Sequence, residues 1–155
     1  MKRLIKRYDK PGEWRVVIPF DKEGEEHEWI GIVDGRVEGE YELTVVASHR
    51  VANTKGRVTV RAVCGEKSSV RLKGIIRIFK EAQETDDFLE LRVITLGPMS
   101  RATVEPELEI MANNVKASHG ASVGGIDPQQ LLYLESRGLS MREAEDQIIG
   151  GWLGV

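Results

Sequence analysis

Apolar and polar residues alternate with a period of two along most of this chain, which is the pattern of half-buried β-strands. The apolar positions of successive runs are Trp14, Val16, Ile18 and Phe20; Leu43, Val45 and Ala47; Val58, Val60 and Ala62; Val70, Leu72, Ile76 and Ile78; Leu89, Leu91 and Val93; Val104, Leu108 and Ile110; and Val115, Ala117, Ala121 and Val123. Polar residues, such as Thr59 and Arg61, fill the other positions. The pattern predicts many short strands, each with one face in a core.

Turn-forming residues separate these runs at nearly regular intervals. They are Asp34-Gly35, residues 53–56, 65–67 and 83–87, Gly97-Pro98, Asn113-Asn114 and Gly124-Gly125. Short strands at this spacing indicate an all-β body over residues 1–125, followed by a separate segment over residues 126–155. Periodicity alone leaves a sandwich, a barrel and a coiled solenoid open. The spacing favours a solenoid, although no clean internal repeat is present.

The C-terminal segment changes to a helical pattern. Asp127 is a suitable N-cap with Pro128 in the first helical position, and Gly138 ends this short helix. Ser140 and Glu143 have the spacing of a capping box that opens a second helix. We therefore expect the β body to be followed by a helix-turn-helix.

The 155 residues fit one domain, and 41% of them are hydrophobic, enough for a real core. A net charge of −3 gives no long-range attraction to nucleic acid or anionic lipid. No apolar run is long enough to span a membrane, and the single cysteine, Cys64, cannot form an intrachain disulfide. These features predict a cytoplasmic protein.

Residues 107–153 resemble the C-terminal signature of the SufB/SufD family of iron–sulfur cluster assembly scaffolds. The matching positions are Pro106, Leu108, Glu109 and Ile110; Val115, Lys116, Ser118, His119, Gly120 and Ala121; and Tyr133, Leu134, Ser136, Arg137, Gly138 and Ala144. Upstream, His49, Asn53 and Thr54 resemble the family's "HxxxNT" step. The resemblance covers about residues 41–153, and residues 1–40 fit only as further strands.

The resemblance implies a right-handed parallel β-helix followed by the helical segment. It further implies a scaffold, not an enzyme, that pairs through its β-helix with a second copy or with a SufB-like chain. The C-terminal helices are expected to dock a SufC-type ABC ATPase, and a transient iron–sulfur cluster is expected at the subunit interface. ATP turnover belongs to that partner, since this chain has no GxxxxGK[ST] loop.

His119 is the first candidate for the cluster site. It shares parity with the apolar residues of its strand, which fits either a structural imidazole satisfied inside the core or an iron ligand. In SufD-type proteins the histidine of this motif is assigned to the cluster site. Ser100 and Ala117, however, stand where SufB-type and many SufD-type proteins have cysteine, so the thiolates would come from a partner chain or from Cys64 of a second copy.

Cys64, Glu107 and Glu109 complete the candidate cluster site. Cys64 lies in phase with an apolar run, which favours a buried thiol, although the neighbouring turn leaves room for exposure and for accepting sulfur. Glu107 and Glu109 face the same way on one strand, about 7 Å apart. They are accessory cluster carboxylates, or alternatively the acid–base pair of a β-helical glycan-cleaving enzyme.

Two surfaces remain. Arg57, Arg61, Arg71, Lys73 and Arg77 form a basic stripe, which we interpret as a solvated face balanced by Glu66 and Glu81, because a nucleic-acid platform would need interleaved aromatic residues. The candidate ATPase-docking residues are Tyr133, Arg137, Met141, Ile148, Ile149 and Trp152. The apolar members of this set would either cap the end of the β body or face the partner.

Overall fold

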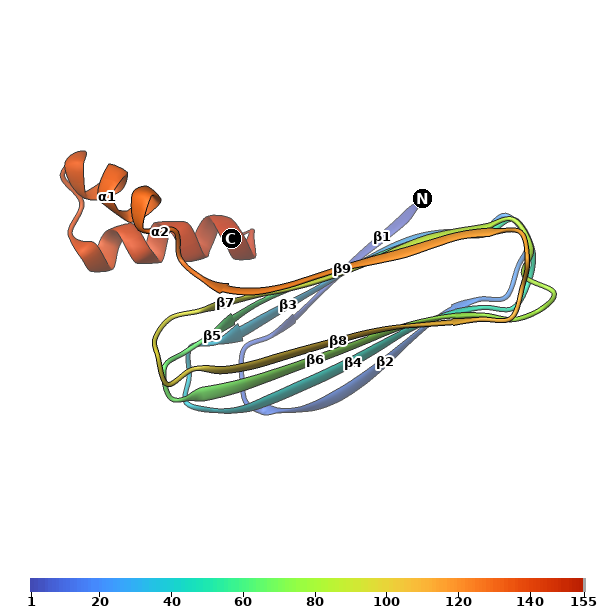
Figure 1. Cartoon of the computed structure of the whole chain (residues 1–155), viewed down its shortest axis with the longest axis horizontal. Coiled ribbons are helices and arrows are strands. Elements are labelled where there is room, and N and C mark those ends of the chain that lie inside the picture. Colours follow the sequence, from blue (N-terminus) through green and yellow to red (C-terminus); the bar gives the residue numbers. More distant parts are fainter. Residues whose placement is uncertain (155) are drawn as a thin grey trace.

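The computed structural model describes residues 1–154, which form nine strands and two helices (Figure 1). The strands are β1 (Lys2–Tyr8), β2 (Gly12–Phe20), β3 (Glu26–Gly35), β4 (Gly39–His49), β5 (Lys55–Cys64), β6 (Ser68–Ile78), β7 (Thr85–Thr95), β8 (Arg101–Ile110) and β9 (Val115–Gly125). The helices are α1 (Pro128–Ser136) and α2 (Met141–Leu153).

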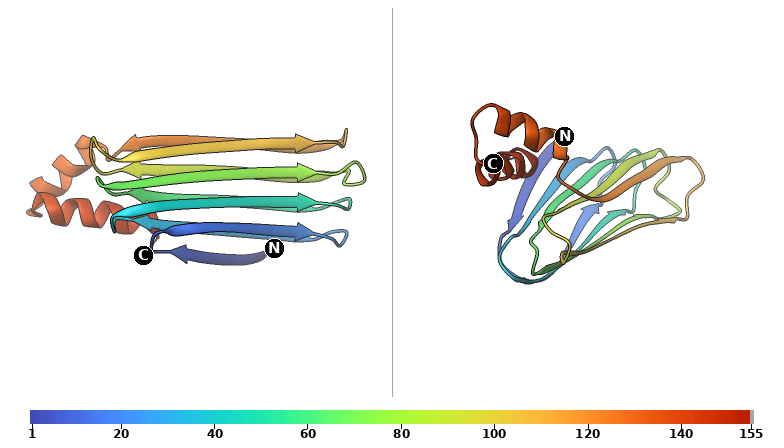
Figure 2. Two further views of the ribbon diagram at one scale, coloured as in Figure 1. Left: turned by 90° about the horizontal axis from the view of Figure 1, so that it is seen from below. Right: turned by 60° about the vertical axis from the view of Figure 1, so that its left-hand side comes forward.

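The strands wind into a solenoid of two parallel sheets. One sheet has the order β1-β3-β5-β7-β9 and the other the order β2-β4-β6-β8, and all the pairings between neighbours are parallel. Each coil therefore supplies one strand to each sheet, and about four coils stack as seen in Figure 2. The predicted β-helix followed by two helices is confirmed, and the sandwich and barrel alternatives are excluded.

The core lies between the two sheets and is built from the positions that the alternation predicted. Its fully buried members come from every interior strand and include Leu43, Val60, Leu72, Ile76 and Leu91. Several predicted turns were placed where strands begin or end: Asp34-Gly35 belongs to β3, Lys55 and Gly56 to β5, and Gly124-Gly125 to β9. The largest error was at residues 83–87, which were expected to form a turn, but β7 begins at Thr85. Thr85 and Asp87 are buried polar residues in phase with Leu89. The start of β7 was not recognised as a strand because its first inward-facing residues are polar.

Both helices begin at the predicted caps. The Asp127 carboxylate accepts a hydrogen bond from the backbone N–H of Gln129, and Ser140 and Glu143 form the capping box of α2. Gly138 has a φ of +98°, a left-handed conformation that glycine adopts without strain, just past the end of α1. Neither described helix has the length and apolar composition needed to cross a lipid bilayer.

Helix α2 packs on the outer face of the five-stranded sheet and not over an open end of the solenoid. Its buried residues Ile149 and Leu153 join Ile32 of β3 and Val63 of β5 in a second, smaller cluster. The Trp152 indole N–H adds a hydrogen bond of 3.3 Å to the Ala62 carbonyl. The expectation that the helical stripe could cap the end of the β body was therefore wrong, and both terminal strands, β8 and β9, keep an open edge.

Candidate functional site

His119 lies on β9, the last strand of its sheet, in register with buried Leu89 of β7. Its side chain faces the same way as the core, but no further coil stacks above β9, so the residue is exposed. Within residues 1–154 the structure has no hydrogen bond or ion pair to the imidazole. His119 is therefore not a core histidine satisfied from inside, and both ring nitrogens remain available for a ligand.

The surface around His119 is the uncovered inner face of the last coil. On β8, Leu108 and Ile110 are 37% and 41% exposed, and on β9 Val123 is 46% exposed, although their partners one coil below are buried. Small residues flank the imidazole on the same face of β9, with Ala117 on one side and Ala121 on the other. We call this surface, formed by the inward-facing residues of β8 and β9, the open end. It combines apolar side chains, one imidazole and two free strand edges.

The two glutamates lie on the opposite, outer face of β8. Glu107 pairs with Lys73 at 3.1 Å and Glu109 pairs with Arg77 at 2.5 Å, both from β6. The hydrogen bond from Arg77 lowers the pKa of Glu109 below its usual range. Because these carboxylates point away from the core face on which His119 lies, the structure does not bring the three residues together. A carboxylate held by a cation and ionised is also poorly suited to the proton donation of a glycosidase acid.

Cys64 is completely buried in the main core. Its thiol lies 3.3 Å from the Ser68 carbonyl oxygen and 3.4 Å from that of Arg101, and burial raises its pKa. Cys64 is six residues beyond Val58, the residue of β5 in line with His119, so about 20 Å of strand separates the two. Within one chain, Cys64 and His119 therefore do not form one site.

Ser100 lies next to Cys64. By the family resemblance, it occupies the position of the SufB-type cysteine. The Ser100 hydroxyl donates toward the carbonyl oxygens of Cys64, at 3.1 Å, and Gly65, at 2.9 Å. It also accepts a hydrogen bond from the Gly97 backbone N–H. Ser100 therefore ties the turn before β8 to the turn after β5. Among residues 1–154 there is no group of three or more His, Cys, Asp or Glu side chains that could hold a metal ion.

The basic residues predicted to form one stripe lie on two different sheets. Arg57 and Arg61 are on β5, whereas Arg71, Lys73 and Arg77 are on β6. The β6 cations face acids of β8, as in the pair of Arg71 with Glu105 at 2.8 Å, and the expected partners Glu66 and Glu81 are not the ones used. The interpretation as a neutralised face therefore applies to the β6 cations alone, with acids of β8 as their partners, whereas the guanidinium groups of Arg57 and Arg61 lie over the rings of Phe88 and Trp152.

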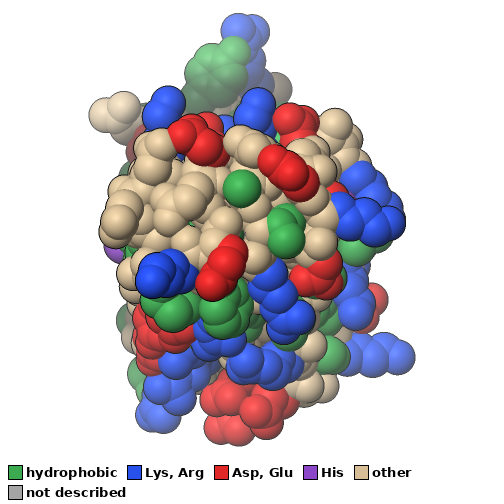
Figure 3. Space-filling model, turned by 90° about the vertical axis from the view of Figure 1, so that its right-hand side faces the viewer, with side chains coloured by type: hydrophobic (Ala, Val, Ile, Leu, Met, Phe, Trp, Pro, Cys, Tyr) green, Lys and Arg blue, Asp and Glu red, His purple; other side chains and the backbone are tan. Residues whose placement is uncertain are grey.

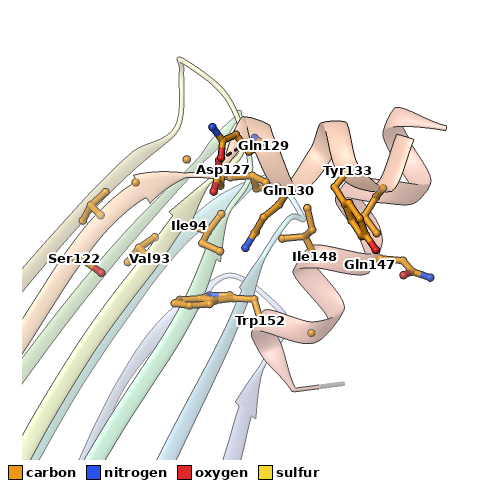
Figure 4. Close-up of a pocket in the computed structure, with 16 residues that line it drawn as sticks. Val93, Ile94, Ser122, Asp127, Gln129, Gln130, Tyr133, Gln147, Ile148 and Trp152 are labelled. Carbon is orange, nitrogen blue, oxygen red and sulfur yellow. Dashed lines mark hydrogen bonds between the residues drawn. The ribbon is translucent and has the colours of Figure 1, made fainter. Parts of the chain in front are cut away.

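A groove of about 910 Å³ separates the helices from the end of β9 (Figure 4). Ile94, Val123 and Trp152 supply apolar walls, while Gln130 and Tyr133 line the α1 side. Apolar walls with a few polar groups are the usual composition of a binding groove. This groove could not be predicted from the sequence, because it depends on where α2 lies on the sheet.

The candidate docking residues fall into two groups. Ile149 is 1% exposed, and half-buried Trp152 is held by Arg61, so both serve mainly to fix α2 on the sheet. Tyr133 and Met141 are 57% and 64% exposed, and the Arg137 guanidinium lies 5.3 Å from the centre of the Tyr133 ring. Ile148 is half-buried and lines the groove. The exposed group thus lies on the surface of the helical hairpin, with Tyr133 at the edge of the groove.

Together, the fold and the open end define a parallel β-helical protein with a docked helical hairpin and an uncovered C-terminal coil. The family model of the SUF system FeS cluster assembly SufBD core domain matches residues 15–152. The chain therefore belongs to the SufBD family, and the match reaches further toward the N-terminus than the resemblance seen in the sequence.

Curated relatives agree with this assignment. The chain is 35% identical to the iron-sulfur cluster assembly protein SufD of Bacillus subtilis over 79% of its length, and 33% identical to SufD of Escherichia coli over 65%. It is 27% identical to SufB of Bacillus subtilis over 68% of its length. The aligned parts span only 28%, 24% and 23% of those proteins, so the chain corresponds to about a quarter of each.

Proposed function

We propose that this chain is a SufD-like scaffold component of iron–sulfur cluster assembly. The support is its membership of the SufBD family and its similarity to proteins named for that process. In this proposal the cluster is cargo, assembled and passed on, and the chain itself is not an enzyme. The proposal includes the cytoplasmic location expected from the sequence.

The observation that carries the proposal is the open end. The last coil exposes side chains whose counterparts one coil below are buried, and His119 lies in the middle of its β9 half. Exposed apolar residues between two free strand edges favour association with another chain. We propose that a second copy or a SufB-like chain covers this end, and that the cluster forms there.

The ligands divide between the chains in this arrangement. His119 supplies a neutral imidazole, which is an acceptable iron ligand. Thiolates come from the partner, because Cys64 is enclosed in the core and far from His119. Glu107 and Glu109 are held by Lys73 and Arg77, so we give them no part in the first coordination sphere.

We further propose that the helical hairpin docks a SufC-type ABC ATPase through Tyr133, Arg137 and Met141. These side chains are exposed, and the groove beside them, lined by Ile148, provides an apolar surface for the partner to bind. Tyrosine and arginine are enriched at the centres of protein interfaces, which suits this assignment. Ile149 and Trp152 act indirectly, by holding α2 on the sheet.

Anaerobic reconstitution with iron and sulfide tests the proposal. The chain is combined with a SufB-like protein and a SufC-type ATPase, and cluster absorbance is measured with the wild type, with His119→Ala and with Ser118→Ala. Ser118 is the exposed neighbour on the opposite face of β9, so its variant is the matched control. Loss of bound cluster in His119→Ala alone is expected. Equal cluster content in all three contradicts the ligand assignment.

The alternative function is a scaffold that keeps the fold and the ATPase contact but binds no cluster. The buried position of the single thiol favours it. Ala121→Glu, which places a charge on the open end beside His119, separates the two proposals. Under either proposal this variant weakens pairing with the partner chain, whereas only the cluster proposal predicts that cluster content falls with it.

A further inference from the structure

Four polar side chains lie inside the solenoid just beneath one set of turns. His49, Thr54, Thr85 and Asp87 are each at most 1% exposed. The imidazole Nδ1 of His49 lies 2.8 Å from Thr54 Oγ1, and its Nε2 lies 2.7 Å from Asp87 Oδ2. The turns above this cluster present charged side chains of both signs to solvent (Figure 3). The cluster itself is buried, one coil below Val115 and Ala117 of β9.

The hydrogen bonds of the cluster can run in only one direction. The Ala82 carbonyl only accepts, so the Thr85 hydroxyl donates to it at 2.9 Å, and Thr54 must donate to Thr85 at 3.2 Å. Thr54 then accepts from His49, which places one proton on Nδ1. The other ring nitrogen, Nε2, has Asp87 as its hydrogen-bond partner. Removing either partner leaves the other buried without its hydrogen bond, which is costly in a core.

The cluster lies where the coil length changes. His49 of β4 is in register with Ile78, 29 residues later, whereas Lys55 of β5 is in register with Asp86, 31 residues later. The segment over residues 79–85, between Ile78 and Asp86, thus holds two more residues than the segment over residues 50–54, between their register partners His49 and Lys55. Since side chains alternate with a period of two, a slip of β7 by two residues would keep every apolar side chain inside. The apolar pattern therefore does not select the observed register.

We propose that the cluster is a register lock that selects the observed pairing of β7 with β5. In this pairing Asp87 lies beside Gly56, and a Cβ at Gly56 would come within 2.4 Å of the Asp87 carboxylate. After a two-residue slip, Asp87 would face Val58 and would lie about 7 Å further along the strand from His49. The slipped form would therefore bury His49 and Asp87 without the hydrogen bond between them. The cost of burying them unpaired excludes this register.

A disulfide reporter tests the proposal in a Cys64→Ala background. In the observed register Thr59 is beside Glu90, and Phe88 lies diagonally at about 8 Å between Cα atoms, beyond the reach of a disulfide. The pair Thr59→Cys and Phe88→Cys therefore oxidises only after a two-residue slip. The pair Thr59→Cys and Glu90→Cys reports the observed register.

We expect the slip reporter to remain reduced in the otherwise unchanged protein and to oxidise when His49→Leu and Asp87→Leu are combined. Each single leucine variant lowers the folding equilibrium constant at least about a hundredfold, and the double variant lowers it less than either. Val60→Ala is the matched control, because it removes core volume without touching the lock, and it leaves the reporter reduced. A folded double variant that keeps the reporter reduced overturns the proposal. So does a double variant that does not fold, or a reporter that oxidises equally in Val60→Ala.

Discussion

The contact between α2 and the outer face of the sheet depends on few residues, so one substitution should release the helix. Ile149 and Leu153 are the buried anchors, each 1% exposed against Ile32 and Val63. Helix α1 has no buried residue of its own and follows α2. A helix of 13 residues is marginal in water without such packing. We therefore predict that Ile149→Ala frees the whole hairpin while the solenoid stays folded.

The size of the effect follows from the burial of Ile149. Truncating a buried isoleucine to alanine costs about 2–5 kcal/mol, and the partly buried neighbours of this cluster favour the lower end. A loss of about 2 kcal/mol corresponds to about a 30-fold fall in the hydrogen-exchange protection of the α2 amides. Hydrogen exchange measures this directly, and the fluorescence of Trp152, whose indole bonds to the Ala62 carbonyl, reports the same release.

Met141→Ala is the control, because its side chain on the first turn of α2 is 64% exposed and should change stability by no more than about 0.5 kcal/mol. The two variants also separate anchoring from docking: Met141→Ala should weaken ATPase binding with α2 still protected. Unchanged protection of α2 in Ile149→Ala would contradict the role of Ile149 as the anchor of the helix. An equal loss of protection in α2 and in the core strands would show that the hairpin is not a separate unit.

Three further predictions rest on single contacts. Cys64 should resist a thiol reagent in the native protein and react fully after unfolding, since burial both encloses the thiol and raises its pKa. Gly56→Ala should lower the free energy of unfolding by about 1–3 kcal/mol in a denaturant titration, because the new methyl group meets the Asp87 carboxylate. Arg77→Gln should raise the pKa of Glu109 in an NMR titration. Because that pKa is depressed in the folded state, the stabilisation is present above the usual carboxyl range and is lost as pH falls through the lowered value.

The alternation predicted the strands because both sheets have one face in a common core, so apolar residues recur every second position. It gave no clean repeat because the coils differ in length: β3 and β5 pair with an offset of 29 residues, β5 and β7 with 31, and β6 and β8 with 32. The turns absorb these differences while the strands keep their phase. A fixed period was therefore absent although the architecture is a solenoid.

The candidate site was only partly predictable. The sequence placed His119 on the core-facing side of its strand, but it could not show that the stack ends there, which is what exposes the imidazole. The alternation also placed Glu107 and Glu109 out of phase with Leu108 and Ile110, on the outer face, whereas His119 was in phase with the core, so the grouping of these three residues in one site disregarded a usable signal. The phase of Thr85 and Asp87 with Leu89 was a usable signal for the buried polar cluster. It was missed because polar residues next to a turn were assigned to the turn.

The position of α2 and the open end are linked by the same physical argument. An apolar helical stripe needs a surface to cover, and two were available: the uncovered inner face of the last coil, and the outer apolar residues Ile32, Val63 and Ile94 of the five-stranded sheet. The helix takes the second, where Trp152 also bonds to the sheet backbone. The inner face around His119 is thus left uncovered, and the hairpin stands beside it. In the proposed function this arrangement lets a pairing partner meet the open end while a docking partner meets the hairpin, with Val123 at the border that the two surfaces share.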